Sequence, residues 1–160
     1  MAGDFSIEQA VPDDAPSLSA LAIRSKAHWG YSQEFMEACV MELTITTAQL
    51  ERRELVAFKA IEGEQLLGFY ALEFLGDKTC ELDALFVEPE HIGCGIGRAL
   101  LVHAQAQAIG LSARVISIQG DPNAAAFYEA AGARHVGDRE SGSIPGRYLP
   151  LYELDAAPLG

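Results

Sequence analysis

Apolar residues recur at helical spacing through the first third of the chain. Residues 5–11 alternate like a short strand that stops at Pro12, and Asp13 or Asp14 then offers an N-cap. The helix that follows is expected to bury one side, formed by Leu18, Leu21, Ala22 and Ser25. A second helix is predicted from Ser32 towards Leu43, and residues 46–52 predict a further helical turn.

From Leu55 onwards the apolar spacing is that of strands. Residues 55–61, 65–75 and 80–87 are three strand-like runs, separated by the short turn signals at 62–64 and 76–79. Because such short connections join antiparallel strands, these runs predict an antiparallel meander.

The remaining pattern alternates between helix and strand. Residues 98–110 predict a helix that stops at Gly110, 113–119 a strand, and 121–132 a short helix begun by Asp121 or Asn123. The last two strands, 134–138 and 147–154, are expected to pair, with Pro150 at an edge or a bulge. The order β-α-α-βββ-α-β-α-β-β predicts one α/β domain over 1–160, with its core at about 5–154. Its sheet should be mixed, mostly antiparallel and flanked by helices, with one crossover.

Composition narrows the class of protein. No apolar run approaches the roughly 20 residues that cross a bilayer, and the first residues lack a signal-peptide pattern, so we expect a cytoplasmic protein without membrane contact. The three cysteines and four histidines are scattered. Their spacing favours neither a disulfide framework nor a metal site, and we expect no metal.

The net charge of −12 bears on the partners. An acidic chain is repelled by phosphate backbones, so nucleic acid is a poor partner. A cationic small molecule or a basic peptide would be attracted. The excess of carboxylates could equally serve only solubility.

Three glycines at alternate positions, Gly93, Gly95 and Gly97, precede the helix at 98–110. A dinucleotide fingerprint requires G-x-G-x-x-G, but the third glycine position falls on Arg98 or on Leu100, depending on the starting glycine. No Gly-Lys-Ser/Thr follows either, which excludes a nucleotide-hydrolase loop. An anion site at the helix N-terminus, or a purely structural turn, remains. Arg98 in the first turn opposes the helix dipole and favours a bound anion.

The glycine stretch and a second segment together resemble a known family. The run ELDALFVEPEHIGCGIGRALL, 81–101, is similar to the acyl-CoA pyrophosphate loop of the GNAT superfamily of N-acetyltransferases with its flanks. The run DPNAAAFYEAAGA, 121–133, is similar to the second cofactor segment of that family. Two segments at the family spacing are more specific than either alone, and the predicted element order matches the family fold.

The resemblance implies an acetyl-CoA site. The backbone of Leu85, Phe86 and Val87 would bind the pantetheine arm like an added strand. The pyrophosphate would lie on Ile92, Gly93, Cys94, Gly95, Ile96, Gly97 and Arg98, and Asn123 and Phe127 would line the thiol end. Two positions depart from the family. Ile92 stands where it has Gln or Arg, and Ala133 where it often has Phe; we expect adjusted, not abolished, affinity. Asn123 could also be only a helix cap.

The resemblance also implies catalytic roles. An alkylammonium must lose a proton before it attacks a thioester, and the departing thiolate benefits from receiving one. Tyr128 stands at the general-acid position of the family, and Glu81 is a candidate base. Asp83 shares its strand face by parity, so either carboxylate could act, directly or through water. A backbone N–H of the same strand would polarise the acetyl carbonyl.

The acceptor is expected to be a primary amine of a small molecule or a peptide. His28, Trp29 and Tyr31 lie between the two N-terminal helices, a region that covers the acceptor site in this family, and aromatic faces bind cations. Trp29 could instead only fill the junction between these helices. Homodimers are common in the family, so a homodimer is possible. The alternative function is a non-catalytic acyl-CoA-binding or sensor module on the same fold.

Overall fold

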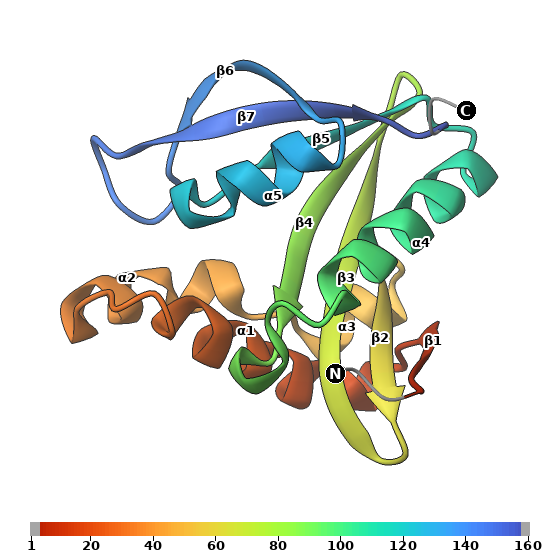
Figure 1. Ribbon diagram of the computed structural model, residues 1–160, viewed down its shortest axis with the longest axis horizontal. Coiled ribbons are helices and arrows are strands. Elements are labelled where there is room, and N and C mark those ends of the chain that lie inside the picture. The colour runs from red at the N-terminus through yellow and green to blue at the C-terminus, as the bar shows by residue number, and fades with distance from the viewer. Residues whose placement is uncertain (1–3, 158–160) are drawn as a thin grey trace.

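A computed structural model describes residues 4–157, so both ends of the predicted domain, 1–3 and 158–160, lie outside the described residues. Its sheet has seven strands in the order β1-β2-β3-β4-β5-β7-β6 (Figure 1). The strands are β1 Ser6–Gln9, β2 Val56–Glu62, β3 Gln65–Gly76, β4 Thr79–Val87, β5 Val115–Gln119, β6 Arg134–Glu140 and β7 Tyr148–Asp155. The α-helices are α1 Ala15–Ala27, α2 Gln33–Leu43, α3 Thr47–Glu51, α4 Ile96–Gly110 and α5 Ala125–Ala130.

Local capping explains most of the helix starts. The Ser32 hydroxyl accepts a hydrogen bond from Phe35 N–H at the start of α2, and Thr46 accepts one from Gln49 N–H at the start of α3. Helix α4 begins at Ile96, two residues before its predicted start at 98. The reason is Gly95, which caps α4 in a left-handed conformation with a φ of 86°.

The helices cover the sheet on two faces and form two apolar cores. Helices α1, α2 and α3 pack against the sheet face that carries Phe69 and Ala71, and they bury Leu18 and Leu21 of α1, Leu43 of α2 and Leu50 of α3. Helix α4 buries Leu100 and Leu101 on the opposite face, in a core that continues to Tyr128 of α5. In Figure 1, α4 and the α1–α3 group accordingly lie on opposite sides of β3 and β4.

The mixed sheet agrees with the prediction. Strands β4 and β5 form its one parallel pair in the described part of the chain, and α4 is their crossover. The final strands β6 and β7 pair as expected. Of the two positions expected for Pro150, an edge or a bulge, the structure has the second, because β7 is an interior strand with a bulge in its neighbour β6. Pro150 is tolerated there because it comes immediately before Leu151, the first β7 residue paired with β5, and lies beside a bulge in β6.

The parallel pairing of β4 with β5 is short, and the sheet is split beyond it. Only Thr79, Cys80 and Glu81 of β4 pair with β5, after which the two strands diverge (Figure 1). None of the helices among residues 4–157 is both long and apolar enough to span a membrane.

Candidate active site

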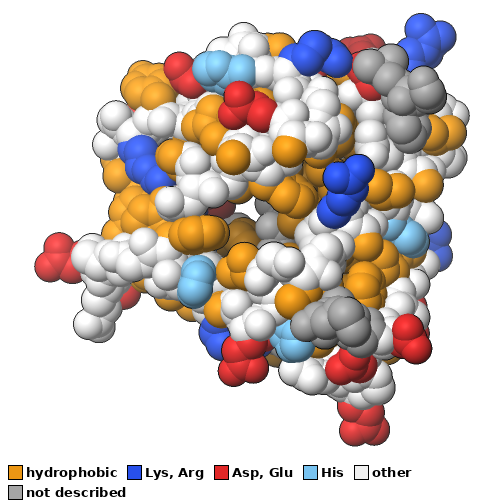
Figure 2. Space-filling model, viewed as in Figure 1, with side chains coloured by type: hydrophobic (Ala, Val, Ile, Leu, Met, Phe, Trp, Pro, Cys, Tyr) orange, Lys and Arg blue, Asp and Glu red, His pale blue; other side chains and the backbone are white. Residues whose placement is uncertain are grey.

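The divergence of β4 and β5 creates a cleft of about 640 Å³, within the range of roughly 300–1,000 Å³ of small-molecule sites. The hollow is visible near the centre of the face in Figure 2, with hydrophobic side chains around it. Most of the residues expected at the site line this cleft: Trp29, Glu81, Asp83, Leu85, Phe86, Val87, Ile92, Gly93, Gly95, Gly97, Arg98, Asn123, Phe127 and Tyr128. Cys94, Ile96, His28 and Tyr31 are not among its lining residues.

The edge of β4 that faces the cleft carries free backbone groups. Glu88 N–H donates to Leu67 C=O on the β3 side, and Phe86 pairs with Phe69. Because backbone groups alternate in direction along a strand, those of Leu85 and Val87 point the other way, towards the diverged β5. These N–H and C=O groups suit an extended ligand that carries amides.

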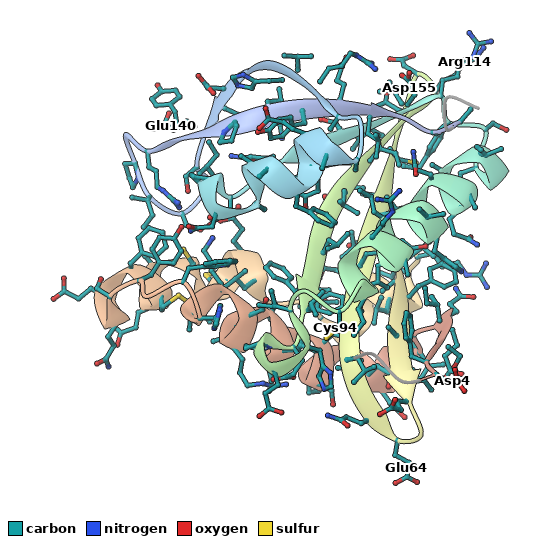
Figure 3. All side chains as sticks on the ribbon, viewed as in Figure 1. Asp4, Glu64, Cys94, Arg114, Glu140 and Asp155 are labelled. Atoms are coloured by element: carbon teal, nitrogen blue, oxygen red, sulfur yellow. The ribbon has the colours of Figure 1, made fainter. Side chains whose placement is uncertain are left out.

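The glycine turn lies where β4 meets α4. Gly93 and Gly95 both have positive φ, 88° and 86°, which turns the backbone sharply before the helix begins. Figure 3 shows Cys94 in this turn, and its thiol, like those of Cys39 and Cys80, is free. Ile96 is fully buried and anchors the turn in the core, whereas Arg98 is exposed beside the cleft. Such a helix start attracts anions.

Tyr128 borders the cleft from α5. The residue is buried, with 6% of its surface exposed, and its ring meets that of Phe127 edge-on at 5.2 Å between centroids. Burial, with a smaller effect of Asp121, raises the pKa of the Tyr128 phenol above its ordinary value. The phenol therefore keeps its proton at neutral pH and can serve as a proton donor.

Three carboxylates meet on the sheet face opposite α4. Residue Asp83 is an extra residue in β4, since Ala84 pairs with Ala71 and Leu82 with Leu72. This bulge brings carboxylate oxygens of Asp83, Glu81 and Glu73 within 4.8 Å of one another.

The three acids differ in their surroundings. Loss of water in the cleft, followed by the charges of Glu73 and Glu81, raises the pKa of Asp83 to about 8. The Asp83 side chain faces the open cleft, so its residue is exposed, but the cleft walls displace much of its surrounding water. Glu81 instead forms an ion pair with Arg139 of β6, with 2.7 Å between Oε1 and Nη1. Asp83 can therefore change protonation near neutral pH.

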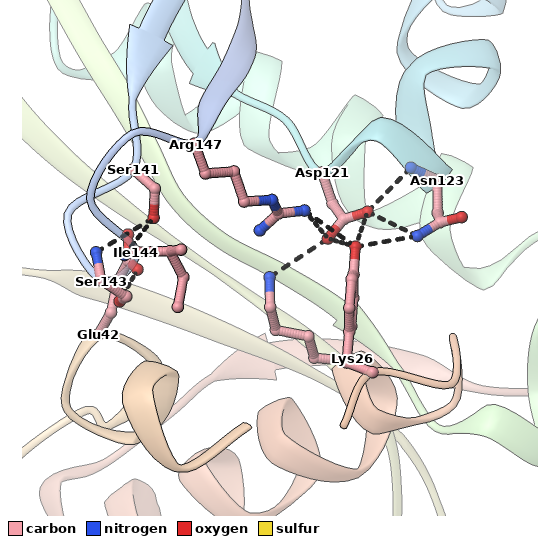
Figure 4. Close-up of polar contacts among 9 residues, drawn as sticks. Lys26, Glu42, Asp121, Asn123, Ser141, Ser143, Ile144 and Arg147 are labelled. Carbon is pink, nitrogen blue, oxygen red and sulfur yellow. Dashed lines mark hydrogen bonds and ion pairs between the residues drawn. The ribbon is translucent and has the colours of Figure 1, made fainter. Parts of the chain in front are cut away.

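A second polar group, here called the Asp121 cluster, lies at the other wall of the cleft (Figure 4). It consists of Lys26, Tyr31, Asp121, Asn123 and Arg147. Asp121 accepts from the Tyr31 hydroxyl at 2.8 Å and from Lys26 Nζ at 3.2 Å. The Tyr31 hydroxyl also accepts from Arg147 Nη2 at 3.0 Å.

Hydrogen bonds decide the charge of Asp121. Its burial alone would raise the pKa of this carboxyl group, but Asn123 N–H, the Tyr31 hydroxyl and Lys26 together lower the pKa below the ordinary value. Burial and the hydrogen bond to Asp121 raise the pKa of the Tyr31 phenol. Asp121 is therefore ionised and Tyr31 protonated at neutral pH, which keeps the cluster intact.

The residues expected at the acceptor end occupy three different places. Trp29 lines the cleft and is 45% exposed. His28 is exposed and contacts the Trp29 ring edge-on. The Tyr31 ring stacks on Phe35 at 4.2 Å, and its neighbouring cations are Lys26 and Arg147 of the protein itself. A role of these three residues in acceptor binding stays a prediction, for which the position of Trp29 is the most favourable.

Four charged residues of the site were not predicted from the sequence. Glu73, Lys26, Arg139 and Arg147 come from β3, α1, β6 and the loop before β7. Each stands in its own segment without a motif, and each reaches the site only through tertiary structure. Asp121 was expected only as a helix cap, a role that it also fills by accepting Asn123 N–H at 2.8 Å.

The family described as the acetyltransferase (GNAT) family matches residues 21–133, well over half of the chain. The chain belongs to this family, and it is therefore an acyltransferase by class. The peptidyl-lysine N-acetyltransferase YjaB of Escherichia coli K12 is 27% identical over 122 residues, covering 76% of this chain and 70% of that protein. The protein of the same name from Salmonella typhimurium LT2 is 28% identical over 130 residues, 81% of this chain and 77% of its own.

Solved structures of the family share the fold. The PaiA N-acetyltransferase of Thermoplasma acidophilum, in complex with coenzyme A, superposes with a TM-score of 0.75 at 18% identity, covering 96% of this chain and 99% of that one. An aminoglycoside 6'-N-acetyltransferase complexed with coenzyme A has a TM-score of 0.70 at 18% identity, and the match covers 97% of this chain and 99% of that one. The predicted family and fold class are thereby confirmed.

Proposed function

We propose that this protein is an acetyl-CoA-dependent N-acetyltransferase whose acceptor is a primary amine of a small molecule or a peptide. The observation that carries the proposal is one continuous cleft. It joins the glycine turn, the free edge of β4, the phenol of Tyr128 and the carboxylates of Glu81 and Asp83. Coenzyme A in complexes of two structural neighbours supports the cofactor, and the name of the YjaB relatives supports lysine peptides as the first acceptors to test.

The cofactor end fits the chemistry of coenzyme A. Free backbone groups of Leu85 and Val87 would bind the amides of the pantetheine arm, and the turn from Ile92 to Arg98 would bind the pyrophosphate. Asn123 and Phe127 line the opposite wall. When bound, acetyl-CoA supplies the acetyl thioester.

Proton transfer is the task of the protein side chains. Asp83 or Glu81 would take the proton of the acceptor ammonium, directly or through a water, so that the amine lone pair can form the new N–C bond. A backbone N–H of β4 would stabilise the charge on the acetyl oxygen. As the C–S bond breaks, the Tyr128 hydroxyl would give its proton to the sulfur, and the second proton that the nitrogen loses on becoming an amide would return, directly or through water, to the Tyr128 oxygen. The products are an amide and a free thiol.

The first test is binding and turnover. Calorimetry should detect acetyl-CoA binding, and a thiol reagent should detect coenzyme A release that depends on an amine from a panel of lysine peptides and small amines. Tyr128→Phe should lower kcat by about 10²-fold or more with acetyl-CoA binding retained, because only the proton donor is lost. An exposed tyrosine, Tyr148→Phe, is the matched control and should behave as wild type.

Two results would contradict the proposal. The absence of acetyl-CoA binding at millimolar concentration would reject the cofactor. Binding without turnover for every amine, unchanged by Tyr128→Phe, would identify a non-catalytic acyl-CoA-binding module instead.

A further inference from the structure

Hydrogen bonds within the Asp121 cluster occupy both N–H donors of the Asn123 carboxamide. The Asn123 carboxamide nitrogen, Nδ2, donates to Asp121 Oδ1 at 2.9 Å and to the Tyr31 hydroxyl at 3.1 Å. An amide NH₂ group has two N–H donors, so neither remains for a ligand. Among residues 4–157 no donor reaches its oxygen, Oδ1, which Figure 4 shows directed away from Asp121.

The orientation of this carboxamide is determined by charge. If it were flipped, Oδ1 would face the ionised Asp121 carboxylate, two acceptors with no hydrogen between them. The backbone N–H of Asn123 also donates to Asp121 Oδ1, at 2.8 Å, which holds the residue beside this carboxylate. Asn123, which lines the cleft, therefore has a side-chain acceptor but no side-chain donor left for a ligand.

The hydrogen-bonding capacity of the Tyr31 hydroxyl is also fully occupied within the cluster. Its hydroxyl donates to Asp121 and accepts from Asn123 Nδ2 and from Arg147 Nη2, which accounts for its one donor and both of its lone pairs. Its ring is held by stacking on Phe35, with the Arg147 guanidinium 4.7 Å from the Phe35 centroid. These contacts hold the Tyr31 hydroxyl in a single position and a single hydrogen-bonding orientation.

These contacts connect segments that are far apart in the sequence. Tyr31 lies between α1 and α2, whereas Asn123 lies between β5 and α5, on the wall that faces Leu85 and Val87 across the cleft. The free groups of β4 and the acceptor oxygen of Asn123 thus border the same cleft from two sides.

We propose that Tyr31 and Asp121 are positioning residues that hold the Asn123 carboxamide as a hydrogen-bond acceptor for an amide N–H of the pantetheine arm. The inference rests on the proposed function. It makes the segment between α1 and α2, which also carries Trp29, part of the cofactor site.

The test compares two ligands that share the nucleotide end. Coenzyme A has the pantetheine arm, and adenosine 3',5'-bisphosphate lacks it. Tyr31→Phe, which keeps the ring, should weaken coenzyme A binding about five- to tenfold, the effect of one hydrogen bond. The affinity for adenosine 3',5'-bisphosphate, measured by displacement of coenzyme A, should stay within twofold of wild type.

A double-mutant cycle separates positioning from general damage. In an Asn123→Ala background, Tyr31→Phe should have no further effect on coenzyme A affinity, because the group that it positions is gone. The proposal is overturned if Tyr31→Phe weakens both ligands equally, weakens neither, or has its full effect without Asn123. Failure of the wild type to bind coenzyme A would instead reject the proposed function.

Discussion

At the scale of single residues, the titration of Asp83 decides which acid can act as the base. Desolvation and the neighbouring carboxylates Glu73 and Glu81 disfavour its ionised form, while the positive charge of Arg139 is taken by Glu81. A pKa near 8 means that Asp83 is mostly protonated at pH 7 and cannot accept a proton until the pH rises. Its raised pKa also makes it a better base once ionised.

The raised pKa of Asp83 predicts how catalysis depends on pH. We expect kcat/KM to rise with pH and level off, with a midpoint near 8, when Asp83 loses its proton. Asp83→Asn should lower kcat by about 10²–10⁴-fold and abolish this limb. Glu81→Gln removes a negative neighbour and leaves Arg139 unpaired, so the midpoint should move to lower pH.

The acceptor amine also titrates, which requires a control. The profile should be measured with two acceptors whose amine pKa values differ, because a midpoint that belongs to the enzyme stays in place. Full activity of Asp83→Asn with an unchanged limb would show that another group is the base.

At the scale of elements, the approach of β3 to β4 and α4 depends on Gly68. A Cβ atom added there would lie 2.8 Å from the Phe86 carbonyl oxygen of β4 and 3.2 Å from Leu100 Cδ1 of α4. The first contact is with backbone, which cannot move without shifting the β4 edge that borders the cleft. The absence of a side chain at Gly68 therefore supports both the packing of α4 and the position of the proposed cofactor edge.

Gly68→Ala should accordingly destabilise the protein, by about 1–3 kcal/mol in the free energy of unfolding, because of overpacking. Gly110→Ala is the matched control, since nothing lies within 4 Å of an added Cβ at this helical residue. It should be neutral or stabilising by up to about 1 kcal/mol. Urea unfolding of both variants measures the difference, and equal stabilities would disprove the packing argument.

At the scale of the whole molecule, the sheet consists of two parts joined by a short contact. Strands β1 to β4 form one part and β5 to β7 the other, and only three residue pairs connect β4 with β5. The cleft fills the space where the strands diverge, so its ligand would contact both parts. Binding to the folded state alone raises its stability by mass action.

Acetyl-CoA should therefore raise the melting temperature. At about 100 times the Kd the gain is about 2.7 kcal/mol. For a domain of this size that gain corresponds to a shift of about 5–11 °C. NADH at the same concentration should give no shift, because the spacing of Gly93, Gly95 and Gly97 is not that of a dinucleotide loop. A comparable shift with NADH would contradict the assignment of the turn.

Much of this fold could be predicted because its signals are local. The second and third helices follow the caps Ser32 and Thr46, and the meander follows its short turns. The predictions were incomplete where a residue depends on more distant partners. Pro150 lies in an interior strand and is tolerated there because the β5 pairing stops at Leu151, which nothing near Pro150 in the sequence reveals.

The sequence by itself determined the elements, their order, the glycine turn and the family, because apolar periodicity, capping and turn residues act over a few positions. Only the tertiary structure decided the electrostatics of the cleft. The bulge at Asp83 gathers three acids, the ion pair of Arg139 with Glu81 joins residues 58 positions apart, and the hydrogen bond of Asn123 with Tyr31 joins residues 92 positions apart. The pKa of an acid and the direction of a carboxamide depend on these neighbours, which the tertiary fold brings together and no short stretch of sequence contains.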